Sequence, residues 1–252
     1  EEKEKKKDIK IPFKKVEDEA YLITEGKGAA SMCVTSCNGE LNPPFISAKG
    51  INYLKQHFQS NELDIFVDTY AKCGTTVGIK MVYKILEANG KVSAGSNKEK
   101  LNDPWNAVPW IEVDVSQQLL GSPSPNDFLS FIEHSTNNKI PRLWKTHAPL
   151  INFPASKIGE NTKILHIIRN PKDVVCSYYD FFRQEPMVAY KGSFNTLFDW
   201  FCDGSVVHSS IFDFELNWFR AQRDGVLTDK QLLIIAYEDI KRKPKEIIQR
   251  VA

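Results

Sequence analysis

The residues with the clearest capacity for chemistry are a lysine, a glycine and two threonines in segment 69–76, which reads T-Y-A-K-C-G-T-T. Gly74 allows a tight turn that brings the backbone close to a ligand. If a helix begins here, its first N–H groups and its dipole favour an anion. Thr75 and Thr76 add hydroxyl donors, and Lys72 adds a positive charge. The segment predicts a phosphate loop, although an ordinary strand-to-helix turn with an exposed lysine would also explain it.

A second polar turn follows the apolar run at 163–168. Arg169, at the end of that run, can hold a phosphate through two parallel hydrogen bonds. Ser177 lies about two helical turns further on, and its hydroxyl could reach the same anion. Alternatively, Arg169 pairs with Asp173 as a structural ion pair, and Ser177 is a polar residue within a helix. Taken alone, this turn favours the structural interpretation.

Strand and helix patterns alternate along the chain and must position these residues. The predicted strands are 63–69, 108–113, 163–168 and 232–237. The predicted helices are 77–86, 171–182 and 211–223. Nearly continuous apolar runs are typical of strands buried on both faces, so the alternation predicts an α/β fold with a central parallel sheet flanked by helices. Ligands of such sheets bind at the carboxyl ends of the strands, where both polar turns would lie.

The composition excludes several classes of protein. Lys plus Arg number 33 and Asp plus Glu 32 among 252 residues, and the net charge of +1 argues against a nucleic-acid-coating protein. No apolar stretch approaches the ~20 residues of a membrane span, and the charged N-terminus lacks the apolar region of a signal peptide. The five cysteines fit reduced thiols better than a disulfide framework. We expect a cytoplasmic protein with a charged arm at 1–20 and a single domain at 21–252.

Four segments together resemble the cytosolic sulfotransferase family. The phosphate loop of that family reads T-Y-P-K-S-G-T-T, which is similar to 69–76, and its R-N-P-K-D-V-x-x-S-Y-Y motif resembles 169–179. A K-T-H element followed by P-L is matched at 145–150, and a Y-E-D element at 237–239. The similarity covers about residues 40–252 and keeps the two anion motifs in the family's order.

The resemblance implies a P-loop-like strand-loop-helix and the transfer of a sulfuryl group from 3′-phosphoadenosine 5′-phosphosulfate (PAPS). The implied acceptor is a hydroxyl or amine of a small, apolar molecule, and the product nucleotide is adenosine 3′,5′-diphosphate (PAP). His147 would act as the base, and Lys72 and Lys145 would stabilise developing charge. Since lysines neutralise that charge, no metal is implied. A homodimer is possible, and neither nucleic acid nor membrane is an expected partner.

The same resemblance assigns the remaining site residues. Phe181 and His147 are implied to contact the acceptor, and Trp105, Trp110 and Phe153 are further candidates. The other histidines lack the K-T-H setting and are expected to be structural or exposed; they are His57, His134, His166 and His208. The implied donor-binding residues are Lys72, Cys73, Gly74, Thr75, Thr76, Arg169, Ser177 and Tyr237.

Departures from the family pattern support an alternative, a non-catalytic protein that binds PAP or PAPS. Ala71 replaces a proline, Cys73 replaces a serine, and Val77 stands where many members have a tryptophan stacked on the adenine. The domain at 21–252 is also expected to lack the family's R-K-G-x-x-G-D-W-K segment, which would follow Ala252. The catalytic lysines and histidine speak against this alternative, because a pure binder needs no base. A magnesium-dependent kinase is disfavoured, because no Walker G-x-x-x-x-G-K-[ST] pattern is present.

Overall fold

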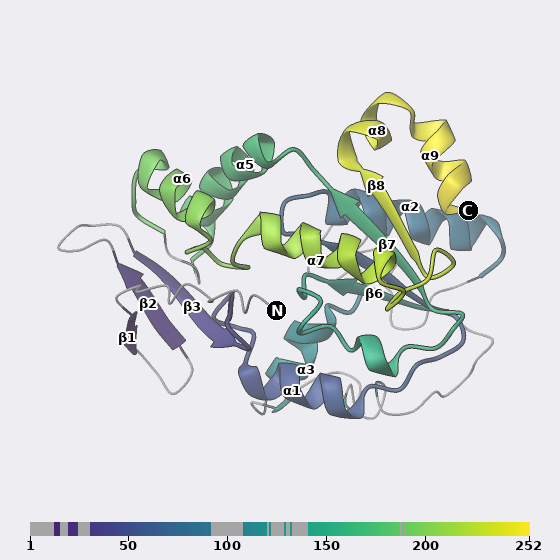
Figure 1. Cartoon of the computed structure of the whole chain (residues 1–252), viewed down its shortest axis with the longest axis horizontal. Coiled ribbons are helices and arrows are strands. Elements are labelled where there is room, and N and C mark those ends of the chain that lie inside the picture. The colour runs from purple at the N-terminus through teal and green to yellow at the C-terminus, as the bar shows by residue number, and fades with distance from the viewer. Residues whose placement is uncertain are drawn as a thin grey trace.

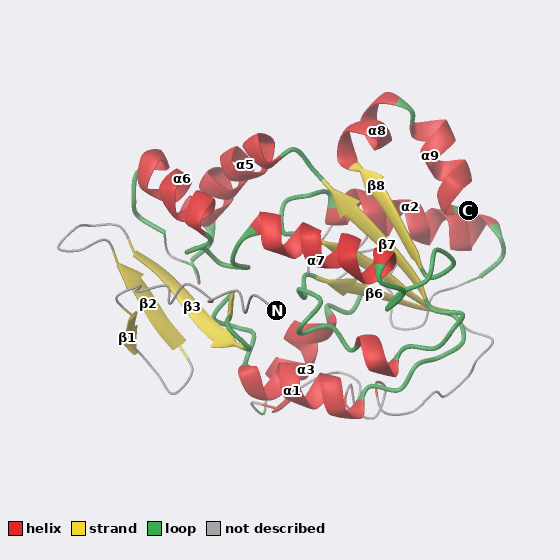
Figure 2. Ribbon diagram, in the orientation of Figure 1, coloured by secondary structure: helices red, strands yellow, loops and turns green. Residues whose placement is uncertain are grey.

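The computed structural model describes most of the chain from residue 31 onward. The described residues are 31–91, 108–119, 121, 129, 132, 141–186, 188 and 190–252, with the backbone of two strands at 13–15 and 20–24. Within them, no helix is long and apolar enough to cross a bilayer. Figure 1 and Figure 2 show a twisted sheet with helices on both faces and a smaller sheet at one end of the molecule.

The central sheet is parallel throughout and has the strand order β6-β5-β7-β8. Its strands are β5 (Asp64–Thr69), β6 (Arg142–Thr146), β7 (Lys163–Ile168) and β8 (Leu232–Ala236). The strands predicted at 63–69, 163–168 and 232–237 are therefore confirmed. The last one ends a residue early, because Tyr237 already begins a helix. The strand β6 supplies the K-T of the K-T-H element at its carboxyl end.

Consecutive residues of the central strands bury their side chains on opposite faces of the sheet, as the pleat requires. Val67 and Leu165 pack in one core cluster, whereas their neighbours Phe66 and Ile164 pack in another. The first cluster lies under α2, α8 and α9, and the second under α1, α3, α5, α6 and α7. The bounds are α1 (Ala48–His57), α2 (Thr75–Ala88), α3 (Ile111–Leu119), α5 (Pro171–Gln184), α6 (Phe194–Asp203), α7 (Ile211–Arg223), α8 (Tyr237–Arg242) and α9 (Pro244–Val251).

The predicted helices begin and end for identifiable local reasons. Helix α5 has Pro171 in its first turn, and the side chain of Asn170 accepts a hydrogen bond from the backbone N–H of Lys172. Helix α7 is capped by Ser210, whose hydroxyl accepts from the N–H of Asp213 at 3.2 Å. The three helices expected from apolar spacing are thus confirmed as α2, α5 and α7.

The strand predicted at 108–113 is wrong. Trp110 makes only an isolated bridge to Lys145, and α3 begins at Ile111. Pro109 has no N–H to donate to a ladder. Glu112 and Asp114 lie in the first helical turn, where the helix dipole favours negative charge. Ile111, Val113 and Val115 alternate along the sequence as they would in a strand, although they lie in this helix.

The small sheet was not predicted. It is antiparallel, in the order β1-β2-β3-β4. Its strands are β1 (Phe13–Lys15), β2 (Ala20–Thr24), β3 (Ser31–Cys37) and β4 (Glu40–Asn42). Strand β1 lies within the region expected to be a charged arm. In β3, Met32 and Val34 are buried and alternate with partly exposed residues.

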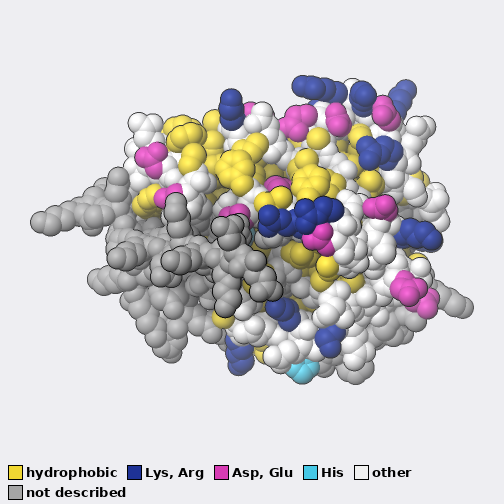
Figure 3. All heavy atoms as spheres, in the orientation of Figure 1, with side chains coloured by type: hydrophobic (Ala, Val, Ile, Leu, Met, Phe, Trp, Pro, Cys, Tyr) yellow, Lys and Arg dark blue, Asp and Glu magenta, His cyan; other side chains and the backbone are white. Residues whose placement is uncertain are grey.

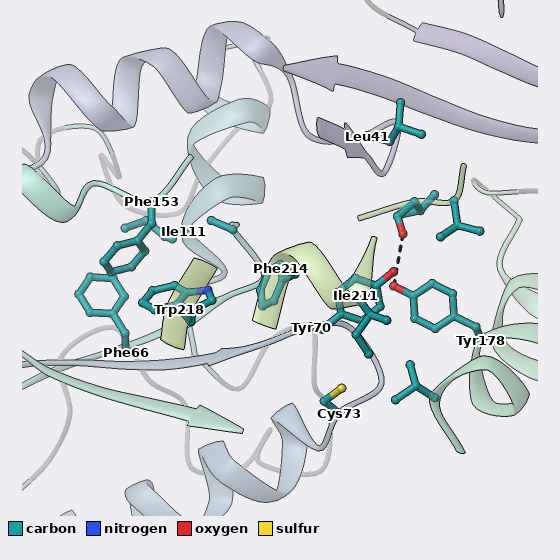
Figure 4. Packing of buried hydrophobic residues seen from close by; sticks show 14 of the residues in the cluster. Leu41, Phe66, Tyr70, Cys73, Ile111, Phe153, Tyr178, Ile211, Phe214 and Trp218 are labelled. Carbon is teal, nitrogen blue, oxygen red and sulfur yellow. Dashed lines mark hydrogen bonds between the residues drawn. The ribbon is translucent and has the colours of Figure 1, made fainter. Parts of the chain in front are cut away.

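Helix α7 divides its apolar residues between the core and the surface. Phe214 and Trp218 are buried against the sheet, as Figure 4 shows. Phe212, Leu216 and Phe219 are exposed on the other side of the helix. Figure 3 shows apolar side chains gathered on the face that carries α7 in Figure 1.

Buried charge occurs within the sheet as well. His166, expected to be structural, lies between Asp68 and Glu215, with Nδ1 and Nε2 at 2.5 and 2.6 Å from their carboxylate oxygens. Burial alone would lower the pKa of His166, but the hydrogen bonds to both carboxylates outweigh it and raise the pKa to about 9. This histidine therefore joins β5, β7 and α7 and has no place in the candidate site.

Candidate functional site

The segments that follow all four parallel strands meet at one cavity of about 310 Å³. Lys72 follows β5, His147 follows β6, Arg169 follows β7 and Tyr237 follows β8, and all four line the cavity. The carboxyl edge of a parallel sheet is the usual position of a ligand site in such folds. The topology therefore brings together motifs that are far apart in the sequence.

The turn between β5 and α2 has the shape of an anion cradle. Lys72 and Gly74 have left-handed backbones, with φ of +69° and +112°. A Cβ on Gly74 would lie 2.5 Å from Cδ2 of Tyr237, so only glycine fits this position. Thr75 and Thr76 line the cavity at the start of α2, where the first N–H groups have no partner within the helix. These donors can therefore serve a bound anion.

Two cations from different turns meet beside this cradle. A guanidinium nitrogen of Arg169 donates to the backbone oxygen of Lys72 at 2.9 Å, and Cζ of Arg169 lies 4.8 Å from the ring centre of Tyr237. Its Nε is buried without a hydrogen-bond partner among the described residues. Lys72 Nζ lies 4.2 Å from the ring centre of Phe181. Burial, and then Arg169, lower the pKa of Lys72 below its usual 10.5.

The end of β6 carries a further cation and an imidazole. Lys145 and His147 are two residues apart on extended backbone, and both line the cavity, as expected. The N–H of Lys145 donates to the backbone oxygen of Pro109 at 2.9 Å. Its Nζ lies 3.7 Å from the ring centre of Trp110. The turn before α3 thus contacts both the backbone and the side chain of Lys145.

The hydrogen bonds of His147 determine its tautomer. Nδ1 lies 2.7 Å from the backbone oxygen of Thr69, and a carbonyl can only accept, so Nδ1 carries the proton. Nε2 therefore retains its lone pair. Burial lowers the pKa of His147 well below 6.5, and the charge of Lys145 lowers it further. The neutral imidazole present at pH 7 can accept a proton.

All the predicted site residues line the cavity except Cys73. The thiol of Cys73 is fully buried in the core near Tyr70 and Ile211, as Figure 4 shows. The backbone N–H of Cys73 donates to the backbone oxygen of Tyr70 at 3.1 Å. Cys73, expected to contribute a donor to the nucleotide, therefore does not line the cavity, and its backbone N–H already has a partner. The residues that do line the cavity are Lys72, Gly74, Thr75, Thr76, Lys145, His147, Arg169, Ser177, Phe181 and Tyr237.

The aromatic candidates have different outcomes. Trp110 lines the cavity, as proposed for the acceptor pocket. Phe153 packs on Phe66 and Trp218 in the core instead, with ring centres 5.0 and 5.2 Å away. Trp105 lies outside the described residues.

Sequence reasoning missed two residues of the site. His208 is buried in the cavity wall with its ring centre 5.4 Å from that of His147, and its Nδ1 has no hydrogen-bond partner among the described residues. Burial, and then Lys145, lower its pKa to about 3. Glu112 accepts a hydrogen bond from the backbone N–H of His147 at 2.9 Å. No local motif marks either residue. Each reaches His147 only because elements that are distant in the sequence pack together.

The charges of the cavity favour an anionic ligand. Lys72, Lys145 and Arg169 line it, and Glu185 is the acidic residue of the wall. The unpartnered Arg169 Nε and the cradle at Gly74 are unused donors of the kind that bind phosphate or sulfate. The neutral His147 adds a proton acceptor within the same cavity.

Known proteins share this sequence pattern. The sulfotransferase domain family matches residues 62–252. Sulfotransferase 1A1 of Rattus norvegicus is 30% identical over 220 residues, which cover 83% of this chain and 68% of the relative. Sulfotransferase 2A1 of Macaca fascicularis is 27% identical over 199 residues, which cover 79% of this chain and 61% of the relative. The chain thus spans less than two thirds of the length of the second relative.

The fold is shared as well. The structure of mouse sulfotransferase SULT7A1 complexed with PAP superposes with a TM-score of 0.59 and 22% identity, covering 86% of this chain and 67% of that one. The matched family region contains both anion motifs, the K-T-H element and all four central strands. On this match of sequence, together with the shared fold, the chain belongs to the sulfotransferase family.

Proposed function

We propose that this protein transfers a sulfuryl group from PAPS to a hydroxyl or amine of a small, apolar acceptor. The observation that carries this proposal is the convergence of Lys72, Lys145, Arg169 and a neutral His147 on one cavity. In-line group transfer needs positioning and charge stabilisation more than covalent catalysis. Three cations and one proton acceptor meet that need.

The donor nucleotide is bound by the two anion turns. The start of α2, with Thr75 and Thr76, holds the 5′-phosphosulfate, and Lys72 neutralises its charge. Arg169 and Ser177 hold the 3′-phosphate, since a guanidinium can donate two parallel hydrogen bonds to a phosphate. The buried, unpartnered Nε of Arg169 supports this assignment.

His147 removes the acceptor's proton during transfer. The acceptor oxygen or nitrogen forms a bond to sulfur while the bond between sulfur and the bridging phosphate oxygen breaks. The electron pair of the broken bond stays on the 5′-phosphate of PAP, and the acceptor proton moves to Nε2 of His147. Lys72 and Lys145 stabilise the charge that develops on the bridging oxygen and the sulfuryl group.

The acceptor side of the cavity is largely apolar. Phe45, Phe181, Phe182 and Val207 line it, which suits a small apolar molecule that presents one hydroxyl or amine to His147. Lys72 Nζ already lies over the Phe181 ring, so the acceptor wall and the donor site are adjacent.

The decisive experiment measures transfer of labelled sulfate from PAPS to a panel of phenols, sterols and amines, together with calorimetric binding of PAP. PAPS-dependent transfer to any acceptor supports the proposal. PAP binding without transfer to any acceptor supports the alternative, a non-catalytic PAP-binding protein. Absence of both refutes both functions. The presence of His147 with an open lone pair favours the enzyme, because a binder needs no base.

The shifted pKa values predict a broad pH profile of kcat/KM. His147 must be neutral, so activity is lost as the pH falls through its pKa, which lies below 6.5. Lys72 must be charged, so activity is lost as the pH rises through its pKa, which lies below 10.5. Initial rates measured from pH 4 to 11 check both limbs. A Lys72→Arg variant should shift the alkaline limb upward, and an acidic limb at or above 6.5 would contradict the base assignment.

Gly74→Ala should weaken PAP binding by about tenfold or more, because the strained turn and Tyr237 must both move. Calorimetric titration with PAP measures the effect. Gly90→Ala is the matched control, since Gly90 is also left-handed, with φ of +68°, but a Cβ there meets no atom within 4 Å. Equal PAP affinity in both variants would show that the Gly74 turn does not form the cradle.

A further inference from the structure

The carboxylate of Glu112, on helix α3, contacts the carboxyl end of strand β6, just where His147 follows it. Glu112 lies in the first turn of α3, and its Oε1 accepts from the backbone N–H of His147 at 2.9 Å. The same oxygen accepts from the hydroxyl of Thr146. That hydroxyl in turn accepts from the N–H of Ala148 at 3.1 Å. One carboxylate oxygen thus organises the backbone from Thr146 to Ala148.

This carboxylate is shielded from water and held rigidly. Glu112 is 2% exposed. Its backbone oxygen accepts from the Ser116 hydroxyl at 2.7 Å, and that hydroxyl accepts from the N–H of Ser47 at 3.0 Å just before α1. Because α1 and α3 pack together, the position of Glu112 is fixed by two helices. A hydrogen bond between a buried carboxylate and a backbone N–H is among the stronger kinds in proteins.

His147 is therefore held from two sides. Its side chain donates to the Thr69 oxygen on β5, and its backbone donates to Glu112 on α3. Trp110 packs edge-on against the imidazole, with ring centres 4.9 Å apart. Neither contact occupies Nε2. The arrangement leaves that nitrogen as the part of the ring available to the cavity.

We propose that Glu112 is a positioning residue for His147. By fixing the backbone after β6, it holds the imidazole where Nδ1 reaches the Thr69 oxygen and Nε2 faces the acceptor. The role rests on the proposed function only in that His147 is the base; the geometry it enforces exists without substrate. Glu112 itself touches no reacting atom.

Two variants of similar size distinguish the effect of the hydrogen-bond-accepting oxygen from the effect of side-chain volume. Glu112→Leu fills the space but removes the hydrogen-bond acceptor, whereas Glu112→Gln keeps an oxygen that can accept a hydrogen bond. Val115→Ala is the matched control, because Val115 is fully buried in the same helix but makes no hydrogen bond to β6. It loosens α3 without removing the contact to His147.

The first measurement is the ring ¹⁵N resonances of His147, assigned by their loss in His147→Ala. The wild type should show the Nδ1–H tautomer. Glu112→Leu should shift these resonances or mix the tautomers, while Glu112→Gln and Val115→Ala should stay near the wild type. Unchanged resonances in Glu112→Leu would overturn the proposal. If Glu112→Leu does not fold, Glu112→Met, which also lacks an acceptor oxygen, takes its place, and unchanged resonances in that variant would overturn the proposal equally.

The second measurement is steady-state kinetics. Since misplacement of a catalytic group by about 1 Å can cost on the order of 100-fold, Glu112→Leu should lower kcat by about 10- to 100-fold. Its KM for PAPS should change little, and Glu112→Gln should restore most of kcat. Equal losses of kcat in Glu112→Leu and Val115→Ala would reveal a merely structural role. If the wild type transfers sulfate to no acceptor, the proposed function fails, and the resonances of His147 still decide whether Glu112 positions it.

Discussion

Replacing His147 by alanine should lower kcat for sulfuryl transfer by about 10²- to 10⁴-fold, the usual contribution of a general base. PAP binding should survive, because the donor cradle is formed by the β5–α2 turn and by Arg169. The imidazole is neutral and offers an unprotonated Nε2, so its loss removes the proton acceptor without removing a charge. Initial rates with PAPS and calorimetry with PAP measure the two effects separately.

Two further variants show whether any loss comes from the base itself. His147→Asn retains a donor for the Thr69 oxygen but has no basic nitrogen, so it should be as inactive as His147→Ala and more stable. His57→Ala, at an exposed histidine on α1, should leave the rate unchanged. A His147 variant that kept more than about a tenth of the wild-type kcat would exclude general-base catalysis by this residue.

Replacing Arg142 by methionine should lower the free energy of unfolding by about 3–5 kcal/mol, because it leaves a buried carboxylate without its partner. Arg142 and Asp64 are 1% and 0% exposed, and the Arg142 guanidinium donates to both Asp64 oxygens at 2.6 Å. They join β6 to β5 at the amino end of the sheet, opposite the site. Urea unfolding monitored by circular dichroism measures the loss.

The surface offers a matched pair for comparison. Arg223 also donates to an aspartate, Asp224, at 2.6 Å, but both side chains are largely exposed. Arg223→Met should therefore cause no resolvable change in the unfolding midpoint. PAP affinity of folded Arg142→Met should equal that of the wild type. If Arg142→Met unfolded at the wild-type denaturant concentration, the buried pair would not be what joins these strands.

The elements that local spacing defines were predicted well. The apolar runs of β5, β7 and β8 and the helical spacing of α2, α5 and α7 match the structure closely. Periodicity depends on each residue's near neighbours, so it is legible in one sequence. At 108–113, a short apolar run allowed either a strand or a helix, and Pro109 with two acidic residues favoured the helix. The small antiparallel sheet had too weak a pattern to be recognised.

The cationic and basic residues of the candidate site were also predictable from the sequence, whereas the position of Cys73 was not. Lys72, Lys145, His147 and Arg169 stand in motifs with recognisable residue order, and the parallel topology brings all four to one cavity. The sequence assigned Cys73 to the same cradle as Lys72. Only the folded turn, with Lys72 in a left-handed conformation, shows that the thiol enters the core while the lysine lines the cavity.

By itself, the sequence determined three of the four central strands, three of the helices, the cationic and basic residues of the candidate site and the family they resemble, because all of these lie in short segments. The tertiary structure alone decided which groups surround His147. Glu112, Thr69 and His208 lie far from it in the chain, and contacts of that range depend on how the elements pack. Burial is likewise a property of the whole fold, and it is burial that keeps His147 neutral and able to accept a proton.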